Sequence, residues 1–278
     1  MATSADRDPP VIGFLTDFGL DGAAATCRAV MLSICPDAQI VDIAHTVPKF
    51  AVADGAFILA GALPYFPVGA HLAVVDPGVG TARRPVAVRT GRGDVLVGPD
   101  NGLLLPAADA LGGAVEAHEL ENRAWWLAAT SATFHGRDVF APVVAHLAGG
   151  SATLASLGPE IAPTQLVRLP EPRARVAGGV LETEVVYVDT FGNVRLAGTR
   201  EQLRDAIGPE GAAVGVALGG VRHEARFVRT FGEVEAGRML VYVDSSGRPA
   251  IGLREGDAAS VTGARRGDRV SIERGERP

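Results

Sequence analysis

The chain is poor in the features that mark secreted, membrane-spanning or disulfide-stabilised proteins. Only two of its 278 residues are cysteines, and aromatic residues make up just 5%. No segment approaches about 18 uninterrupted apolar residues, the length of a membrane-spanning helix. The first ten residues, MATSADRDPP, have no apolar core of the kind found in signal peptides. We therefore expect a soluble cytoplasmic protein that does not associate with membranes.

Excess positive charge is also absent. The 26 Lys and Arg residues are outnumbered by 32 Asp and Glu residues, which gives a net charge of −6 with both signs interspersed. No basic surface is predicted, so we expect no nucleic acid partner. Cys27 and Cys35 lack the repeated CxxC spacing of zinc sites. In one predicted helix they are separated by about 12 Å along the axis, too far for a disulfide, so we expect reduced core thiols.

The chain is rich in glycine, with 35 residues, and in aliphatic side chains, which is typical of a compact globular protein. Up to about residue 157, short apolar runs alternate with longer helical patterns. This alternation predicts a sheet that is covered by helices on both faces. The runs that predict strands are 11–16, 39–43, 71–76, PVAVR and DVLVGP, and the helical patterns are 22–34, 52–63 and 137–150.

The pattern changes after residue 169. The segment 170–179, PEPRARVAGG, is typical of a linker. Beyond it, short β-rich runs alternate with glycine-containing turns, a spacing typical of small barrels or sandwiches. We therefore predict an α/β protein with an N-terminal α/β sandwich-like domain, residues 9–169, around a central, mainly parallel sheet. A smaller C-terminal all-β barrel domain would span residues 180–278.

Two motifs place a carboxylate just after a predicted strand. In LTDFG, Asp17 follows the first strand and is suited to accept hydrogen bonds from a ribose diol; the alternative is that Asp17 caps the following helix. In VVDPGVGTARR, Asp76 ends the third strand, and the following Arg83 can keep that carboxylate ionised. The alternative for Asp76 is a surface turn with a salt bridge.

Two further motifs precede predicted helices. In VGPDNGLLL, an Asx turn by Asp100 and Asn101 explains the polar residues, so we assign this motif a structural role. In TFHGRDVFAP, Thr133, His135 and Asp138 lie at a loop-to-helix junction. Backbone N–H groups at that helix start are candidates for binding a carboxylate. The alternative is an ordinary capped helix in which Asp138 complements the helix dipole.

Taken together, these motifs resemble those of the S-adenosylmethionine hydroxide adenosyltransferases, relatives of the fluorinase and chlorinase. Five motifs occur in the expected order, namely LTDFG, DPGVG with Arg83, GPDNG, TFHGRD and a later DTFGN. The resemblance runs from about residue 11 to 259. It implies hydrolytic cleavage of S-adenosyl-L-methionine to adenosine and L-methionine by water at the ribose C5′. It also implies a homotrimer with sites at the subunit interfaces, and neither metal nor cofactor.

The resemblance also implies roles for individual residues. Asp76, Arg83 and His135 would position and activate the water, and Asp17 would hold the ribose hydroxyls. The halogenases have a tyrosine where Asp76 stands, and the short segment 80–99 leaves no room for the extra fluorinase loop. A carboxylate repels a halide ion, so water is the expected nucleophile. The remaining implied substrate contacts are Phe50, Thr133, Asp189, Phe191, Asn193, Phe231, Ser245, Ser246 and Leu253.

These residue types suit the reaction. Methionine leaves C5′ as a neutral thioether and needs no acid. A carboxylic acid with an ordinary pKa of about 3.9 cannot generate free hydroxide, but Asp76 can accept a proton in the transition state. His135 is suited either to accept a hydrogen bond from the same water or to donate one to it.

Two other functions are compatible with the motifs. The first is a metal-dependent hydrolase of a nucleoside substrate, with Asp17, Asp76, Asp100 and His135 as ligands, although no HxH or HExxH pair is present. The second is a non-catalytic module that binds adenosine or S-adenosylmethionine. Activity that survives chelation would exclude the first, and single-turnover analysis would test the second.

Overall fold

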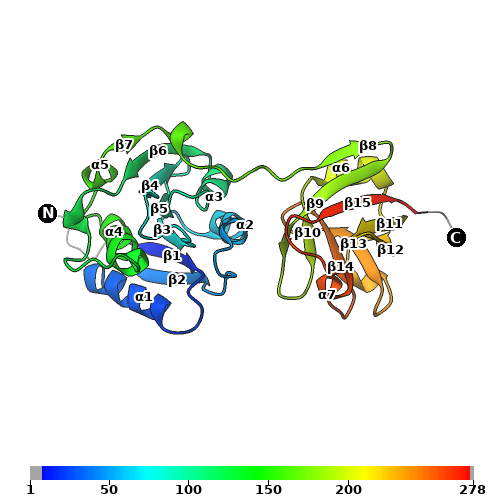
Figure 1. The fold of residues 1–278 in the computed structure, drawn as a ribbon, viewed down its shortest axis with the longest axis horizontal. Helices are drawn as coiled ribbons and strands as arrows, with labels where there is room; N and C mark the ends of the chain where they lie inside the picture. Colours follow the sequence, from blue (N-terminus) through cyan, green and yellow to red (C-terminus); the bar gives the residue numbers. More distant parts are fainter. Residues whose placement is uncertain (1–7, 276–278) are drawn as a thin grey trace. The chain divides into compact units, whose positions relative to one another are not determined.

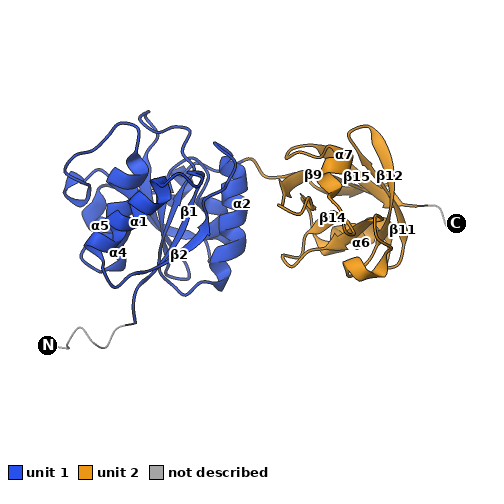
Figure 2. Ribbon diagram, turned by 90° about the horizontal axis from the view of Figure 1, so that it is seen from below, with its two compact units in different colours: residues 1–169 blue, residues 170–278 orange. Residues whose placement is uncertain are grey.

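The computed structural model describes residues 8–275 and divides the chain into two compact units, residues 1–169 and 170–278 (Figures 1 and 2). The first ten residues, for which no signal peptide is expected, lie mostly outside the described residues, because residues 1–7 are not described. Residues 276–278 of the predicted C-terminal domain also lie outside them. Within residues 8–275, no helix is long and apolar enough to cross a membrane.

The first unit is built on a seven-stranded sheet with the strand order β2-β1-β3-β5-β4-β6-β7. Four neighbouring strands pair in parallel, namely β2 (Gln39–Ala44), β1 (Val11–Thr16), β3 (Ala70–Val74) and β5 (Val95–Pro99). Three follow by antiparallel pairing, namely β4 (Pro85–Thr90), β6 (Ala114–Glu119) and β7 (Glu160–Ile161). Because β6 is antiparallel to β4, it runs in the same direction as the parallel group. The expected mainly parallel sheet is confirmed.

Helices cover both faces of this sheet, as predicted (Figure 1). Side chains alternate along β3, so Leu72 packs into one apolar cluster and Ala73 into the other. Helices α1 (Ala23–Ile34) and α4 (Ala141–Ala148) contribute to the first cluster, and α2 (Val52–Ala62) and α3 (Leu105–Ala110) to the second. Shorter helical segments are η2 (Leu63–Tyr65), η3 (Arg123–Trp125), η4 (Gly136–Phe140), α5 (Leu154–Leu157) and η5 (Pro163–Gln165).

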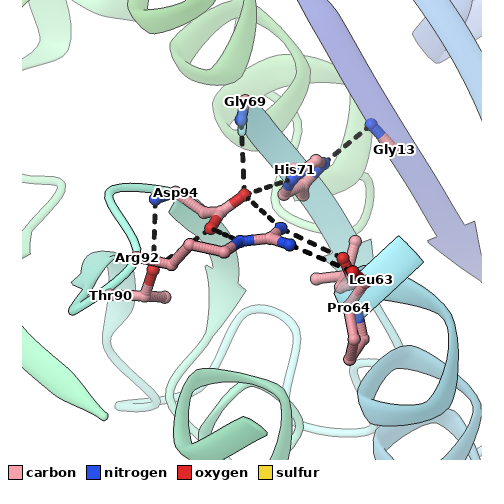
Figure 3. Close-up of polar contacts among 8 residues, drawn as sticks. All are labelled: Gly13, Leu63, Pro64, Gly69, His71, Thr90, Arg92 and Asp94. Carbon is pink, nitrogen blue, oxygen red and sulfur yellow. Dashed lines mark hydrogen bonds and ion pairs between the residues drawn. The ribbon is translucent and has the colours of Figure 1, made fainter. Parts of the chain in front are cut away.

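A buried polar network closes the amino-terminal edge of the parallel strands (Figure 3). The Gly13 N–H donates to His71 Nδ1 at 3.0 Å, so the ring proton is on Nε2, which lies 3.1 Å from Asp94 Oδ1. Arg92 donates to both oxygens of Asp94 and to the Leu63 carbonyl. Burial lowers the pKa of His71, although the Asp94 carboxylate opposes this shift. The network therefore holds a neutral histidine and a paired carboxylate in the core.

The second unit is an all-β barrel, as predicted. Its eight-stranded sheet has the order β10-β14-β13-β12-β11-β15-β9-β8, and it closes because β10 also pairs with β9. The strands are β8 (Arg175–Ala177), β9 (Val180–Val188), β10 (Val194–Leu196), β11 (Ala213–Leu218), β12 (Val221–Phe227), β13 (Met239–Val243), β14 (Pro249–Leu253) and β15 (Arg269–Arg274). Strand β8 lies inside the segment 170–179, so this segment is not linker throughout. The helical segments are α6 (Arg200–Ile207), η6 (Phe231–Glu233) and α7 (Ala258–Thr262).

Candidate active site

Two aspartates follow the carboxyl ends of neighbouring parallel strands. Thr16 of β1 pairs with Val74 of β3, so Asp17 and Asp76 leave the sheet at the same edge. Strand β3 ends at Val74, two residues earlier than predicted, and Asp76 therefore belongs to the loop beyond the strand. Ligand sites of α/β sheets form at this edge, because the loops there carry side chains above the strand ends.

Asp76, Arg83 and His135 form one contiguous group. Arg83 Nε donates to Asp76 Oδ1 at 3.0 Å, and Arg83 Nη2 donates to Asp76 Oδ2, so the pair is bidentate. Both side chains are nearly buried, at 7% and 5% exposure. The guanidinium carbon of Arg83 lies 5.2 Å from the centre of the Phe140 ring, an additional contact for the cation. The alternative of a simple surface turn for Asp76 does not fit this burial.

The same Arg83 determines which nitrogen of His135 accepts a hydrogen bond. Arg83 Nη2 lies 3.2 Å from His135 Nδ1, and a guanidinium only donates hydrogen bonds. Burial lowers the pKa of His135 and the Arg83 charge lowers it further, against the opposing Asp76 and Asp138. The ring is therefore neutral at pH 7, with Nδ1 as the acceptor and the proton on Nε2.

The loop before His135 is organised by a buried carboxylate. Asp138 Oδ2 accepts the Ser131 N–H at 2.7 Å, and Arg137 forms a bidentate pair with Asp138. Although burial alone would raise it, these hydrogen bonds lower the pKa of Asp138. Thr133 is exposed, and its Oγ1 lies 3.2 Å from Ser131 Oγ.

Two of the backbone N–H groups at this junction are already used within the turn. The N–H groups of Arg137 and Asp138 both donate to the Phe134 carbonyl at 3.1 Å. Binding of a carboxylate at this helix start would therefore depend on the N–H groups that precede them. The helix starts as a π-helical turn, Gly136–Phe140, a form that is frequent at functional sites.

Asp17 holds Phe50 instead of capping a helix. Helix α1 begins at Ala23 with Gly22 as its cap residue, so the capping alternative for Asp17 is wrong. Asp17 Oδ2 accepts the Phe50 N–H at 2.9 Å. Phe50 has a left-handed φ of 67°, and the residue is 68% exposed. Such backbone strain in an exposed aromatic residue is characteristic of functional sites.

His45, which the sequence analysis did not select, joins the same two loops. Its Nδ1 lies 2.9 Å from Thr16 Oγ1, and its carbonyl accepts the Gly19 N–H at 2.7 Å. It follows strand β2 directly, as Asp17 follows β1, and this position at a strand end was the available signal.

The Asp17 loop also touches the His135 loop. The rings of Phe18 and Phe134 meet edge to face at 5.7 Å. A Cβ atom on Gly136 would lie 2.7 Å from Phe18 Cζ, so a larger residue here would displace the Phe18 ring. The structure thus brings the two groups of candidate residues in the first unit side by side.

In the second unit, Asp189 organises the turn between β9 and β10. Its Oδ1 accepts the N–H groups of Phe191 at 3.0 Å and Asn193 at 2.9 Å, and its Oδ2 accepts Asn193 Nδ2 at 2.9 Å. Phe191 is 78% exposed. Asp189 thus shapes the loop, and the Phe191 ring remains free to contact a ligand.

The other candidates of the second unit differ in their surroundings. Ser245 and Ser246 are exposed in the turn between β13 and β14. The Phe231 ring packs at 5.1 Å against Tyr242 on the outside of the barrel. Leu253 is partly buried and packs against the apolar cluster inside the barrel.

Asp100 has a structural role, as predicted. It forms an ion pair with Arg84 and accepts the Val167 N–H at 2.8 Å, while Asn101 Oδ1 accepts the Leu103 N–H. Within residues 8–275, no group of three or more His, Cys, Asp or Glu side chains is arranged to hold a metal ion. The four ligands of the metal-hydrolase alternative are therefore not brought together.

Comparison with known proteins identifies the family. The model of the SAM hydroxide adenosyltransferase N-terminal domain matches residues 12–158, and that of the C-terminal domain matches residues 183–271. The chain belongs to the SAM hydroxide adenosyltransferase family. Within this family it is 49% identical over 267 residues to an "(R)-S-adenosyl-L-methionine hydrolase" of Salinispora tropica, covering 96% of this chain and 98% of that protein.

More distant relatives cover nearly as much of the chain. A fluorinase of an Actinoplanes species is 31% identical, over 87% of this chain and 90% of its own length. A crystal structure of an uncharacterized conserved protein from Thermotoga maritima has a TM-score of 0.87 at 36% identity. It covers 95% of this chain and 100% of that one.

Proposed function

We propose that this SAM hydroxide adenosyltransferase cleaves S-adenosyl-L-methionine with water to give adenosine and L-methionine. The family match over both domains and the 49% identity to the Salinispora tropica hydrolase support this reaction. The observation that carries the chemistry is the buried, bidentate Asp76–Arg83 pair with His135 against it. Asp76 and Arg83, with His135, would form the water-activating group.

Asp76 acts as the general base in this proposal. The water oxygen bonds to the ribose C5′ as the C5′–S bond breaks, and the bonding electrons neutralise the sulfonium to give the thioether of methionine. The proton that the water loses passes to the Asp76 carboxylate in the transition state. Arg83 occupies one lone pair on each carboxylate oxygen, and a carboxylate offers about four such positions. Asp76 thus keeps acceptor capacity for the water.

His135 donates a hydrogen bond and does not act as the base. Its Nδ1 faces the Arg83 donor, so a neutral ring carries its proton on Nε2. An Nε2–H group can orient the lone pair of the attacking water, or hold the ribose oxygen, but cannot accept a proton. This geometry favours donation over the acceptor role that the sequence analysis left open.

The remaining candidate residues would bind the substrate. We propose that Asp17 holds the ribose diol, that the exposed Phe50 ring lies against the sugar and the base, and that Thr133 contacts the substrate from the His135 loop. Asp189, Phe191 and Asn193 would surround the adenine and the methionine. The amino-acid end would meet the exposed Ser245 and Ser246, and adenine would meet Phe231 and the Leu253 backbone.

We further propose that the chain acts as a homotrimer in which neighbouring copies complete each site. Support comes from the distribution of the candidates, because the water-activating group lies in residues 1–169 and the adenine and methionine candidates lie in residues 170–278. Light scattering of the intact protein tests the mass. Mixing Asp76→Ala with Asn193→Ala subunits should restore part of the activity, and a monomeric mass without recovery would contradict the trimer.

We propose a cytoplasmic location, with support from two buried free thiols, Cys27 and Cys35. Burial raises the pKa of Cys27 to about 12, so its thiol stays protonated and unreactive.

The decisive experiment is product analysis in oxygen-18 water. We expect adenosine labelled at the 5′ oxygen, together with methionine, and unchanged turnover after exhaustive chelation. Unlabelled adenosine, or preferential formation of 5′-chloro-5′-deoxyadenosine in chloride buffer, would contradict the proposal. Binding of S-adenosylmethionine without turnover would favour the non-catalytic alternative.

A further inference from the structure

Arg195 connects the two loops of the barrel that carry most of the substrate-binding candidates. Its Nη1 donates to Asp244 Oδ2 at 2.5 Å, and its Nη2 donates to Asp189 Oδ2 at 3.3 Å. Asp244 Oδ1 in turn accepts the N–H groups of Ser246 at 2.8 Å and Arg248 at 3.0 Å. The guanidinium thus joins the turn after β9 to the turn after β13.

This ion-pair cluster is largely removed from solvent. The exposed fraction of the side chain is 21% for Arg195, 15% for Asp189 and 1% for Asp244. The Nε atom of Arg195 is buried without a hydrogen-bond partner. A buried cluster of this kind is a weak source of stability, because the desolvation of three charges offsets much of their attraction. A purely stabilising role therefore explains the cluster poorly.

The cluster also borders the aromatic candidate. Tyr242, which precedes Asp244 by two residues, packs on Phe231. A Cβ atom on Gly252 would lie 2.8 Å from the Phe231 ring and 3.1 Å from Asn193 Oδ1. Phe231 and Asn193 therefore both lie against Gly252, next to the loops that Arg195 joins.

The chemistry of this cluster requires arginine. A planar guanidinium presents donors in a fixed fork, so it can engage two carboxylates on separate loops in one orientation. A lysine ammonium is a point charge on a flexible stem and fixes neither loop in the same way.

We infer that Arg195 is a positioning residue for substrate binding: it holds the Asp189 turn and the Ser245–Ser246 turn in register for the adenine and the amino-acid end of S-adenosylmethionine. This inference rests on the proposed function. It acts on binding and not on water activation, because the Asp76 group lies in the other unit.

Three variants of the full-length protein test the inference. Arg195→Met removes both ion pairs, and Arg195→Lys keeps the charge without the fork. Asp244→Asn keeps a carbonyl oxygen for the Ser246 and Arg248 N–H groups and removes the anionic partner of Arg195. Arg175→Met is the matched control, because it breaks an exposed barrel ion pair with Glu182, at 73% and 47% exposure.

The expected result is a selective rise in KM. Arg195→Met and Asp244→Asn should each raise the KM for S-adenosylmethionine roughly 10-fold or more while kcat changes less than about 3-fold, the signature of lost binding. Arg195→Lys should recover part of the affinity, and Arg175→Met should leave both constants unchanged. The double variant Arg195→Met/Asp244→Asn should be no worse than the worse single variant, because both remove the same link.

A structural role would give a different pattern. The inference would be overturned if Arg195→Met and Asp244→Asn lost active protein but kept an unchanged KM, or if their effects added in the double variant. Turnover by the wild-type protein would still uphold the proposed function in that case. If Arg195→Met does not fold, the KM values of Asp244→Asn and Arg195→Lys decide. A wild-type protein that binds S-adenosylmethionine without cleaving it refutes the proposed function, and its dissociation constant then replaces KM as the measured quantity.

Discussion

Phe50 offers a test in which stability and activity should change independently. Its φ of 67° lies in the left-handed region, and the residue is 68% exposed. Phe50→Gly and Phe50→Ala remove the same ring. The two variants differ only in how easily the new residue adopts this backbone conformation.

The size of the difference follows from the backbone. A left-handed conformation costs an L-residue roughly 1–2 kcal/mol, which glycine avoids. Glycine also lowers the free energy of unfolding by roughly 0.5–1 kcal/mol relative to alanine, because it loses more conformational freedom on folding. We therefore expect Phe50→Gly to be more stable than Phe50→Ala by roughly 0–1.5 kcal/mol, with a central value of about 0.75 kcal/mol. Aromatic stacking on a base is worth about 1–3 kcal/mol, so kcat/KM should fall roughly 5- to 150-fold in both variants.

Denaturant unfolding followed by tryptophan fluorescence measures this difference. Both tryptophans of the chain, Trp125 and Trp126, lie in the first unit with Phe50. Leu32 in helix α1, at 39% exposure, is the control position, where Leu32→Ala should be more stable than Leu32→Gly by about 1 kcal/mol. If Phe50→Ala is more stable than Phe50→Gly, as at the control position, the strain argument is wrong. Wild-type kcat/KM in both variants would refute the role of the ring.

Three further outcomes are expected. The kcat should fall by roughly 10²–10⁴-fold in each of the variants Asp76→Ala, Arg83→Ala and His135→Ala, and the losses should be less than additive in combination. A wild-type kcat in His135→Ala would mean that His135 is not part of the water-activating group. The pKa of His135 in the folded protein lies below its ordinary value of about 6.5, so the ring stays neutral until the pH falls below that value. The acid limb of the kcat/KM profile should therefore lie below about pH 6.5. This limb should be absent in His135→Asn. Asp94→Ala leaves buried hydrogen-bond donors unpaired and should lower the free energy of unfolding by about 3–5 kcal/mol. The control is Asp109→Ala, which removes an exposed ion pair. A loss in Asp94→Ala that is no larger than the loss in Asp109→Ala would contradict this expectation.

Several elements with a buried face were predictable from the sequence. The runs VIGFLT and AHLAV are almost wholly buried, and their continuous apolar character indicated strands. Strands with exposed residues gave a weaker signal. The strand VRHEARF carries mostly polar side chains on the outside of the barrel, and AVEAHE places charged residues in a strand near the sheet edge. Neither was predicted, because hydrophobic periodicity reports burial and not hydrogen bonding.

The sequence by itself determined the order of the motifs, the change of fold class after residue 169 and the local Asp76–Arg83 loop. Only the tertiary structure decided which distant groups meet. Phe50 comes to Asp17 across 33 residues, His135 to Arg83 across 52, and Arg195 to Asp244 across 49. Local patterns encode strands and turns. Which groups pair with a charged side chain depends instead on how those strands are ordered in the sheet, and the same order decides that His135 Nδ1 accepts from Arg83.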